Sequence, residues 1–195
     1  QSLLNKALKS YWRSKSIVRD LFTNKIDIYH GLSHELPLGI EKTSIKTVVT
    51  IHDLIFIRYP HLFKLIDRKI YYKKFKSACQ RANKIIAISQ QTKKDIIDFF
   101  EIPESKITVV YQGCNKVFQS PVSDNIKQAI LSKYNIQQDY LLYVGSIEER
   151  KNLLTLLKTL KELPNQKLVI IGNGKAYKVK CLRYIAKNNL SDRVM

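Results

Sequence analysis

Acidic residues are scarce in this sequence of 195 residues, where 16 aspartates and glutamates stand against 34 lysines and arginines, a net charge of +18. Such an excess attracts nucleic acids, anionic lipid headgroups and phosphorylated substrates alike. Most of the basic residues are lysines, which lack the planar fork with which arginine reads bases. The charge is therefore weak evidence for nucleic-acid binding, and a lysine-rich proteome would explain it equally well.

Cysteine is also scarce. Cys79, Cys114 and Cys181 form no CxxC pair and have no histidine at metal-ligand spacing, which argues against a disulfide framework or a zinc site. We expect three reduced thiols in the core. No apolar run approaches the ~18 residues of a membrane span, and no signal segment follows Gln1. We expect a cytoplasmic protein, with peripheral contact to the inner face of the membrane left open.

Glycine and proline are few, 6 and 5 residues, while 45% of residues are apolar, so a fibrous or disordered chain is excluded. Short apolar runs alternate with longer helical patterns, as in βα units stacked on a parallel sheet. Their continuous apolar character predicts strands buried on both faces. The expected strands are Lys25–His30, Lys46–Ile51, Lys84–Ile88, Lys106–Tyr111, Tyr140–Val144 and Lys167–Ile171.

Helical patterns lie between these strands. The pattern His61–Arg81 predicts an amphipathic helix with an apolar stripe of Leu62, Leu65, Ile66, Ile70 and Phe75 beside many lysines. Ser89 is a suitable N-cap for the helix that follows it. The other expected helices are Ser2–Leu21, Gln90–Phe100, Ser123–Tyr134, Asn152–Leu163 and Lys175–Asn189.

One change in composition divides the chain. After Lys106–Tyr111 the sequence turns polar and contains Gly113 and Pro121 before the next strand begins at Tyr140. We therefore predict a first domain over residues 1–113, a linking region over 114–139 and the start of a second domain over 140–195. No internal repeat is present.

The segment Tyr140–Leu154 contains the most informative pattern. A strand ends at Gly145, a loop carries Arg150 and Lys151, and a helix begins near Asn152. Helix N-termini present unpaired N–H groups and a partial positive charge, so two cations there predict a diphosphate site. The segment Gly172–Lys175 is no P-loop, because Val169 occupies the position of the required first glycine.

Polar residues also follow two strands of the first domain. His52 and Asp53 come directly after one strand, and His30, Gly31 and Ser33 come at the end of another. The carboxyl ends of parallel strands are where open α/β sheets bind ligands. A lone histidine there is more often structural, but two such strand ends favour a functional site.

Together these segments resemble the family 4 glycosyltransferases, retaining enzymes whose bacterial members belong to glycosyl transferases group 1. The resemblance covers about residues 27–195 and implies the α/β GT-B architecture, with two facing doubly wound domains. The matching segments are His52-Asp53-Leu54, Ile86-Ala87-Ile88-Ser89, Lys106 to Gly113, Tyr143 to Asn152 and Asp192-Arg193-Val194.

The resemblance implies sugar transfer from a nucleoside diphosphate sugar to a saccharide or lipid-linked acceptor, in cell-surface polysaccharide biosynthesis. Arg150 and Lys151 would contact the diphosphate in place of a metal ion, and no cofactor or metal is expected. His52, with Asp53, would lie in the interdomain cleft near the transferred sugar. The remaining implied site residues are Gly145 and Ser146 on the donor side, and Gly31, Ser33 and Ser89 on the acceptor side.

Departures from the family pattern matter as well. Ser146 stands where many members carry arginine directly after the glycine. The family's glycine-rich loop after its first strand, and its acidic segment that binds the donor sugar, are not found between residues 1 and 195. We therefore expect a piece of a longer enzyme that is inactive by itself.

Two alternatives remain open. The first is a basic module that binds nucleic acid or membrane through lysine-rich helix faces, and its binding should fall steeply with salt. The second is a non-catalytic GT-B scaffold. For the enzyme itself, no nucleic-acid partner is expected, and the lysine-rich helix His61–Arg81 would contact an anionic membrane.

Overall fold

The computed structural model describes residues 3–136 and 139–195, and the chain divides into two compact units, residues 1–113 and 114–195. Ser2, where the first predicted helix begins, lies outside the described residues. So do residues 137 and 138 of the predicted linking region. Among the described residues, no helix combines the length and apolar character needed to cross a membrane.

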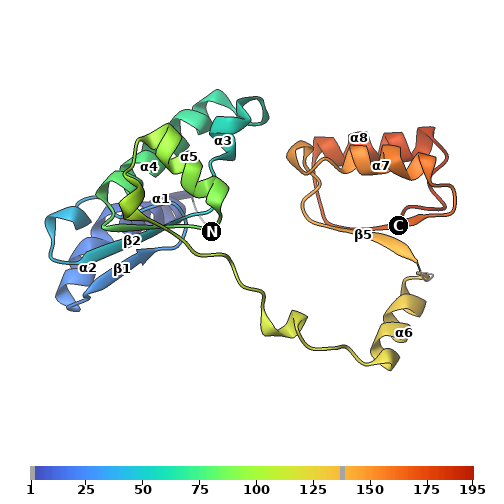
Figure 1. The fold of residues 1–195 in the computed structure, drawn as a ribbon, viewed down its shortest axis with the longest axis horizontal. Helices are drawn as coiled ribbons and strands as arrows, with labels where there is room; N and C mark the ends of the chain where they lie inside the picture. The colour runs from blue at the N-terminus through green and yellow to red at the C-terminus, as the bar shows by residue number, and fades with distance from the viewer. Residues whose placement is uncertain (1–2, 137–138) are drawn as a thin grey trace. The chain divides into compact units, whose positions relative to one another are not determined.

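Unit 1 is built on a parallel sheet in the order β1-β2-β3-β4 (Figure 1). The strands are β1 Ile28–Gly31, β2 Lys46–Ile51, β3 Lys84–Ala87 and β4 Ile107–Val109. All four predicted strands are confirmed, three of them with shorter bounds. In register, Gly31 pairs with Val49 and Ile51 with Ala87, so the strands end along one edge of the sheet.

Helices surround this sheet, and α4 and α5 pack on it (Figure 1). Ser89 caps α5, since its hydroxyl oxygen accepts the Thr92 N–H at 3.0 Å, as predicted. The short helix α3 was not predicted. The helices of unit 1 are α1 Leu3–Tyr11, α2 Ile17–Thr23, α3 Ile55–Arg58, α4 Leu65–Arg81 and α5 Gln90–Phe100, with one-turn 3₁₀ segments at Ile40–Lys42, Pro60–Leu62 and Glu104–Lys106.

The first predicted helix is interrupted. A π-helical segment, Trp12–Ser16, separates α1 from α2, and the Ile17 N–H bonds back to the Trp12 carbonyl. The Ser14 carbonyl accepts the N–H of Leu38 at 2.7 Å, a bond outside the helix. Because a carbonyl engaged elsewhere favours a local change in helix pitch, an uninterrupted α-helix was the wrong prediction here.

The predicted apolar stripe of α4 is confirmed at Phe75, which packs against the core, and wrong at three other positions. Leu65, Ile66 and Ile70 are 60%, 72% and 46% exposed, whereas the buried residues of the helix are Ala78 and Cys79. The helix begins at Leu65 and leaves Leu62 in a separate 3₁₀ turn, so only its C-terminal half packs on the sheet. Apolar side chains among lysines therefore remain on the surface.

The core of unit 1 lies between the sheet and its helices, and it includes Cys79, whose thiol pKa is raised to about 12 by burial. Cys181 is buried in unit 2. Cys114 is exposed, which corrects the prediction of three core thiols. It follows the last residue of unit 1 and lies between β4 and the 3₁₀ turn Lys116–Phe118. The fully buried residues of unit 1 include Ile40, Val49, Ile51, Ile85, Ala87 and Ile96.

Unit 2 has a smaller parallel sheet, in which β5 Tyr140–Val144 pairs with β6 Lys167–Ile171. Both strands match their predicted bounds. Helices α7 Leu153–Glu162 and α8 Ala176–Lys187 lie together on one face of β5 (Figure 1). The core on that face includes Leu153, Leu157, Leu160, Leu168, Cys181 and Leu190. Helix α6, Asp124–Lys133, has no buried residue.

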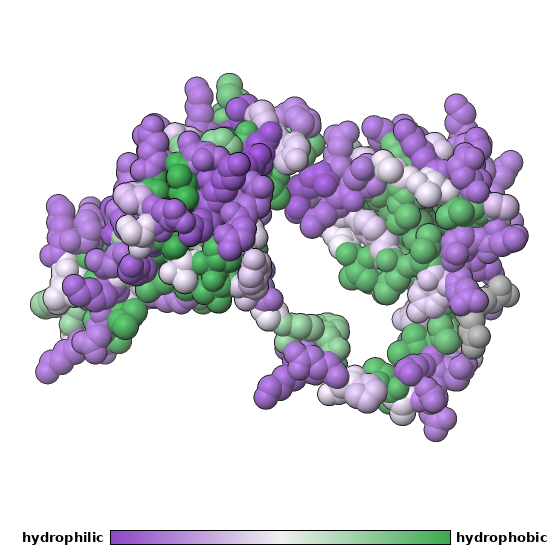
Figure 2. All heavy atoms as spheres, viewed as in Figure 1, coloured by the Kyte–Doolittle hydropathy of each residue, from purple (hydrophilic) through white to green (hydrophobic). Residues whose placement is uncertain are grey.

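The opposite face of β5 is exposed. Leu142 and Val144 are 53% and 68% exposed, and Ile171 of β6 is 57% exposed. Apolar atoms gather there in the space-filling view (Figure 2). The prediction of burial on both faces is therefore confirmed only for most of β2. It is wrong for β1 and for β3, where one face carries exposed Lys84 and half-buried Ile86, and for β5, because only one face of its sheet is covered by helices.

Candidate functional site

In unit 1, two strand ends bring polar groups to one edge of the sheet. His52 and Asp53 follow β2, and Ser89 follows β3. These three residues line one hollow of about 350 Å³, called here the His52 hollow. Tyr59, Gln91 and Asp95 line it as well. The strand end with which the sequence predicted His52 and Asp53 to converge, that of His30, Gly31 and Ser33, lines a different hollow, whereas Ser89, implied by the family resemblance, lies beside them.

His52 forms hydrogen bonds through both ring nitrogens and through its backbone N–H and carbonyl. Its ring Nε2 lies 3.0 Å from the carbonyl oxygen of Leu32, and its Nδ1 lies 3.4 Å from the side-chain nitrogen of Gln112. Its backbone N–H donates to Nδ1 of His34 at 3.4 Å, and its carbonyl accepts the Thr92 hydroxyl at 3.0 Å. The imidazole is thus fixed in place rather than free to rotate.

Asp53 is exposed, and its Oδ1 accepts the backbone N–H of Ile55 at 3.2 Å. This bond begins the turn into α3, since an aspartate side chain can satisfy the N–H two residues ahead. The second carboxylate oxygen has no hydrogen-bond partner among the described residues. Asp53 can therefore order the loop and still accept a hydrogen bond from a ligand hydroxyl.

Gly31 and Ser33 lie elsewhere. They line a larger hollow of about 640 Å³, called here the basic hollow, together with Arg13, Lys73 and Lys74. A side chain at Gly31 would meet the Glu35 carbonyl oxygen at 2.1 Å, so a glycine is required there by packing alone. The predicted acceptor-side residues are therefore divided between two hollows, with Ser89 in the His52 hollow.

In unit 2, the predicted strand, loop and helix are all present. β5 ends at Val144, Gly145 follows at φ 153°, a backbone conformation that favours glycine, and α7 begins at Leu153. A side chain at Gly172 would meet the Gly145 carbonyl oxygen at 1.9 Å. The segment Gly172–Gly174 thus serves close packing against the loop after β5.

Arg150 and Lys151 lie in a 3₁₀ turn just before α7. Arg150 Nε donates to Glu148 Oε2 at 2.9 Å. Lys151 is exposed, and its Nζ has no partner in the described part of the chain. Ser146 accepts the Tyr143 hydroxyl at 3.0 Å through its backbone carbonyl. The side-chain hydroxyl of Ser146 is therefore not engaged by that bond.

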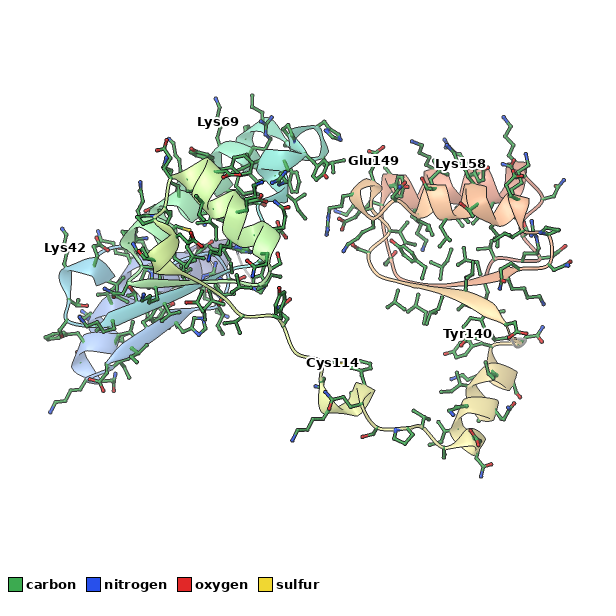
Figure 3. The ribbon with its side chains drawn as sticks, viewed as in Figure 1. Lys42, Lys69, Cys114, Tyr140, Glu149 and Lys158 are labelled. Carbon is green, nitrogen blue, oxygen red and sulfur yellow. The ribbon has the colours of Figure 1, made fainter. Side chains whose placement is uncertain are left out.

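Acidic side chains lie beside Arg150 and Lys151, and the sequence pattern did not predict their effect. Glu148 pairs with Arg150, and Glu149 lies 3.9 Å from Lys180 Nζ (Figure 3 labels Glu149 in this loop). The N-terminus of α7 is also partly occupied, because the Leu154 N–H donates to the Tyr177 hydroxyl at 3.0 Å. The site is therefore less positive than the Arg-Lys pair alone predicts.

His34, Gln112 and the ion pair of Arg58 with Asp95 also belong to the site around His52 and were not predicted from the sequence. Asp95 is 4% exposed and accepts two hydrogen bonds from Arg58 Nε, at 2.8 and 3.0 Å. His34 follows Gly31 and Ser33 directly in the sequence, and a further histidine beside these polar residues was the available signal. No sequence signal marks the Arg58–Asp95 pair, because its members lie on α3 and α5.

Comparison with known proteins supports these assignments of fold. The family model described as Glycosyltransferase Family 4 matches residues 2–116. O-antigen chain mannosyltransferase B of Escherichia coli is 31% identical over 139 residues, which are 70% of this chain and 35% of that protein. O-antigen chain mannosyltransferase RfbU of Salmonella typhimurium is 25% identical over 187 residues, 95% of this chain and 47% of that protein.

Two solved structures are similar in fold. A glycosyltransferase from Rickettsia africae has a TM-score of 0.68 at 17% identity over 92% of this chain and 48% of that one. Anabaena Alr3699/HepE, solved with UDP and glucose, also has a TM-score of 0.68, at 15% identity over 92% of this chain and 49% of that one. The predicted α/β fold of the GT-B type is confirmed, and the chain spans less than half the length of each relative.

Proposed function

This chain belongs to glycosyltransferase family 4, and from that premise we propose that the whole protein moves a sugar from a nucleoside diphosphate sugar to a saccharide or lipid-linked acceptor. The step retains the anomeric configuration and serves cell-surface polysaccharide biosynthesis. Relatives named as O-antigen mannosyltransferases support the pathway, and a similar fold solved with UDP and glucose supports the donor class. The inactivity of residues 1–195 alone stays a prediction.

The turn that carries Arg150 and Lys151 is the observation on which the proposal depends. Arg150 is bonded through Nε to an exposed glutamate, and its terminal nitrogens have no hydrogen-bond partner among the described residues. Lys151 is exposed and lies two residues before α7. Two cations beside a helix N-terminus can stabilise the negative charge that develops on a leaving diphosphate. They take the part that a metal ion has in other transferases.

Unit 1 supplies the groups for the sugar and the acceptor. His52, with Asp53 and Ser89, offers imidazole, carboxylate and hydroxyl groups in one hollow, a set suited to the hydroxyls of a sugar. The basic hollow with Gly31 and Ser33 suits an acceptor that carries negative charge, since Arg13 and Lys73 line it. A lipid-linked diphosphate is an acceptor of this kind.

Helix α4 provides a surface for an anionic membrane. Its first half exposes Leu65, Ile66 and Ile70, and Lys69 projects from the same helix (Figure 3). Apolar side chains among lysines bind the headgroup region by burial and by charge together. Replacing Lys69, Lys73 and Lys74 by glutamine should reduce the fraction of protein that sediments with phosphatidylserine-containing vesicles. The fraction that sediments with neutral vesicles should not change. Unchanged sedimentation would refute this contact.

The central test concerns diphosphate binding. Replacing both Arg150 and Lys151 by alanine should weaken binding of UDP or GDP by roughly 1.5–3 kcal/mol for each lost charged hydrogen bond, measured by calorimetry on the full-length protein. The matched control replaces Lys158 and Lys161, exposed on α7, and changes the net charge equally. Equal affinity in the two double variants would refute the assignment of Arg150 and Lys151.

A further inference from the structure

The loop after β1 folds over the end of β2. His34 N–H donates to the Thr50 carbonyl at 3.1 Å, so the loop is bonded to the strand just before His52. His34 has a φ of 63°, in the left-handed region. This conformation is uncommon for residues other than glycine, although histidine adopts it more often than most, and it persists where the surroundings determine it.

The same loop contacts His52 twice. The Leu32 carbonyl oxygen lies 3.0 Å from Nε2 of His52, and Nδ1 of His34 accepts the His52 backbone N–H at 3.4 Å. A carbonyl can only accept, so Nε2 of His52 must carry the proton. Nδ1 of His52 then holds the lone pair, to which the amide of Gln112 donates at 3.4 Å.

The ring of His34 is fixed by aromatic neighbours. It stacks on Phe75 with centroids 4.2 Å apart and planes 2° from parallel, and it meets the ring of His52 edge-on at 5.1 Å. Burial, together with the charge of His52, lowers the pKa of His34 to about 4. His34 is therefore neutral near pH 7, which leaves its Nδ1 able to accept the His52 N–H.

We propose that His34 is a positioning residue: by accepting the His52 backbone N–H and donating its own N–H to Thr50, it holds the loop whose Leu32 carbonyl keeps His52 as the Nε2–H tautomer, so that Nδ1 is the ring nitrogen offered to a hydroxyl of the bound sugar. The hydroxyl donates to Nδ1 and replaces the Gln112 amide. The statement about the sugar rests on the proposed function, whereas the statement about the tautomer does not. The bond between Nε2–H and the Leu32 carbonyl sets which imidazole nitrogen is free, and His34 acts on it by fixing the backbone on both sides of that bond.

Two substitutions at His34 distinguish the effect of its hydrogen-bond acceptor, Nδ1, from the effect of its aromatic ring. His34→Asn places Oδ1 as many bonds from Cα as Nδ1, tolerates a positive φ and removes the ring. His34→Phe keeps an aromatic ring to stack on Phe75 and removes the acceptor. His61→Asn, at an exposed histidine of the Pro60–Leu62 turn, is the matched control.

The first measurement is the nitrogen spectrum of the imidazoles, which is simple because the sequence has four histidines. Near pH 7 we expect His52 to carry its proton on Nε2 in the wild type, in His34→Asn and in His61→Asn. In His34→Phe we expect a mixture of tautomers. A proton on Nδ1 in the wild type, or an unchanged His52 in His34→Phe, would overturn the proposal.

The second measurement is sugar transfer by the full-length protein. His34→Phe should lower kcat by roughly ten- to a hundredfold with KM little changed, and His34→Asn should restore kcat to within about threefold of wild type. Equal losses in both variants would overturn the positioning role. A wild type with the expected tautomer and no sugar transfer would instead refute the proposed function while the assignment of His34 to the tautomer stands.

Discussion

Arg58 with Asp95 in unit 1, and Arg150 with Glu148 in unit 2, are both arginine–carboxylate pairs, yet the Asp95 side chain is 5% exposed and that of Glu148 is 49% exposed. A buried carboxylate must keep its partner, because an unpaired charge away from water is costly. An exposed one can release its partner to water or to a phosphate at little cost. The first pair therefore maintains structure, and the second leaves its arginine available to a ligand.

The largest expected effect comes from breaking the buried pair. Asp95→Ala removes the acceptor of Arg58 and of the Gln91 amide, which donates to Asp95 at 2.7 Å. We expect a loss of roughly 1.5–3 kcal/mol in the free energy of unfolding of unit 1 for each charged hydrogen bond that Asp95 accepts, since Arg58 is itself partly exposed and can turn to water. Urea unfolding followed by the fluorescence of Trp12, the one tryptophan of the chain, measures it.

The control is Asp98→Ala, at an exposed aspartate on the same helix. Its cost should stay within about 0.5 kcal/mol, as for most surface substitutions. A loss for Asp95→Ala no larger than that of the control would show that the Arg58–Asp95 pair does not hold α3 to α5.

The second comparison is between the two faces of the sheet in unit 2. Leu157→Ala removes a fully buried side chain of α7 and should cost about 2–5 kcal/mol. Leu142→Ala, on the uncovered face of β5, should cost less than about 1 kcal/mol, because that side chain is 53% exposed. Thermal unfolding followed by circular dichroism compares them, and equal losses would place the core of unit 2 on both faces of its sheet.

The strands of this chain could be predicted, because a short apolar run such as Tyr140–Val144 is typical of a strand. Which faces of the strands are buried could not be predicted. Leu142 and Leu141 are the same residue type, yet only Leu141 packs with the core, since helices cover one face of β5. The stripe of Leu65, Ile66 and Ile70 failed for the same reason: periodicity shows which residues share a face, and only tertiary packing decides whether that face is covered.

The site was predictable to a similar degree. His52, Asp53 and Ser89 follow strands that are neighbours in the sheet, so their meeting follows from topology alone. Glu148 lies two residues before Arg150 in the sequence, but the sequence does not show that its side chain bonds to that arginine. The contact between His34 and His52 depends on a left-handed residue in a loop, which no periodic pattern encodes.

A smaller effect should appear in acid, and it should come from unit 1. The pKa of His34 is lowered from 6.5 to about 4, so between these values the unfolded chain binds a proton that the folded chain does not. The contribution of His34 to stability is therefore complete above pH 6.5. It is lost progressively as the pH falls from 6.5 through 4. The loss is at most about 3 kcal/mol.

The groups that act on this titration are His52, which lowers the pKa of His34, and Asp53 and Glu35, which raise it. The measurement is the difference in unfolding free energy between wild type and His34→Asn from pH 7 to pH 3.5, followed by Trp12 fluorescence. Carboxylates titrate in both proteins, so the difference isolates His34. A difference that does not change with pH would show that His34 is not buried as a neutral ring.

The smallest effect should come from the exposed pair of unit 2. Glu148→Gln removes the partner of Arg150 and should change the free energy of unfolding by less than about 1 kcal/mol, since exposed ion pairs contribute little. Because it also frees Arg150, it should tighten UDP or GDP binding by up to about fivefold, the equivalent of 0.2–1 kcal/mol. Glu162→Gln, at an exposed glutamate that ends α7, changes the net charge equally without touching Arg150. A gain in affinity shared by both variants would mean that overall charge attracts the nucleotide; a gain confined to Glu148→Gln would mean that Arg150 itself contacts the diphosphate.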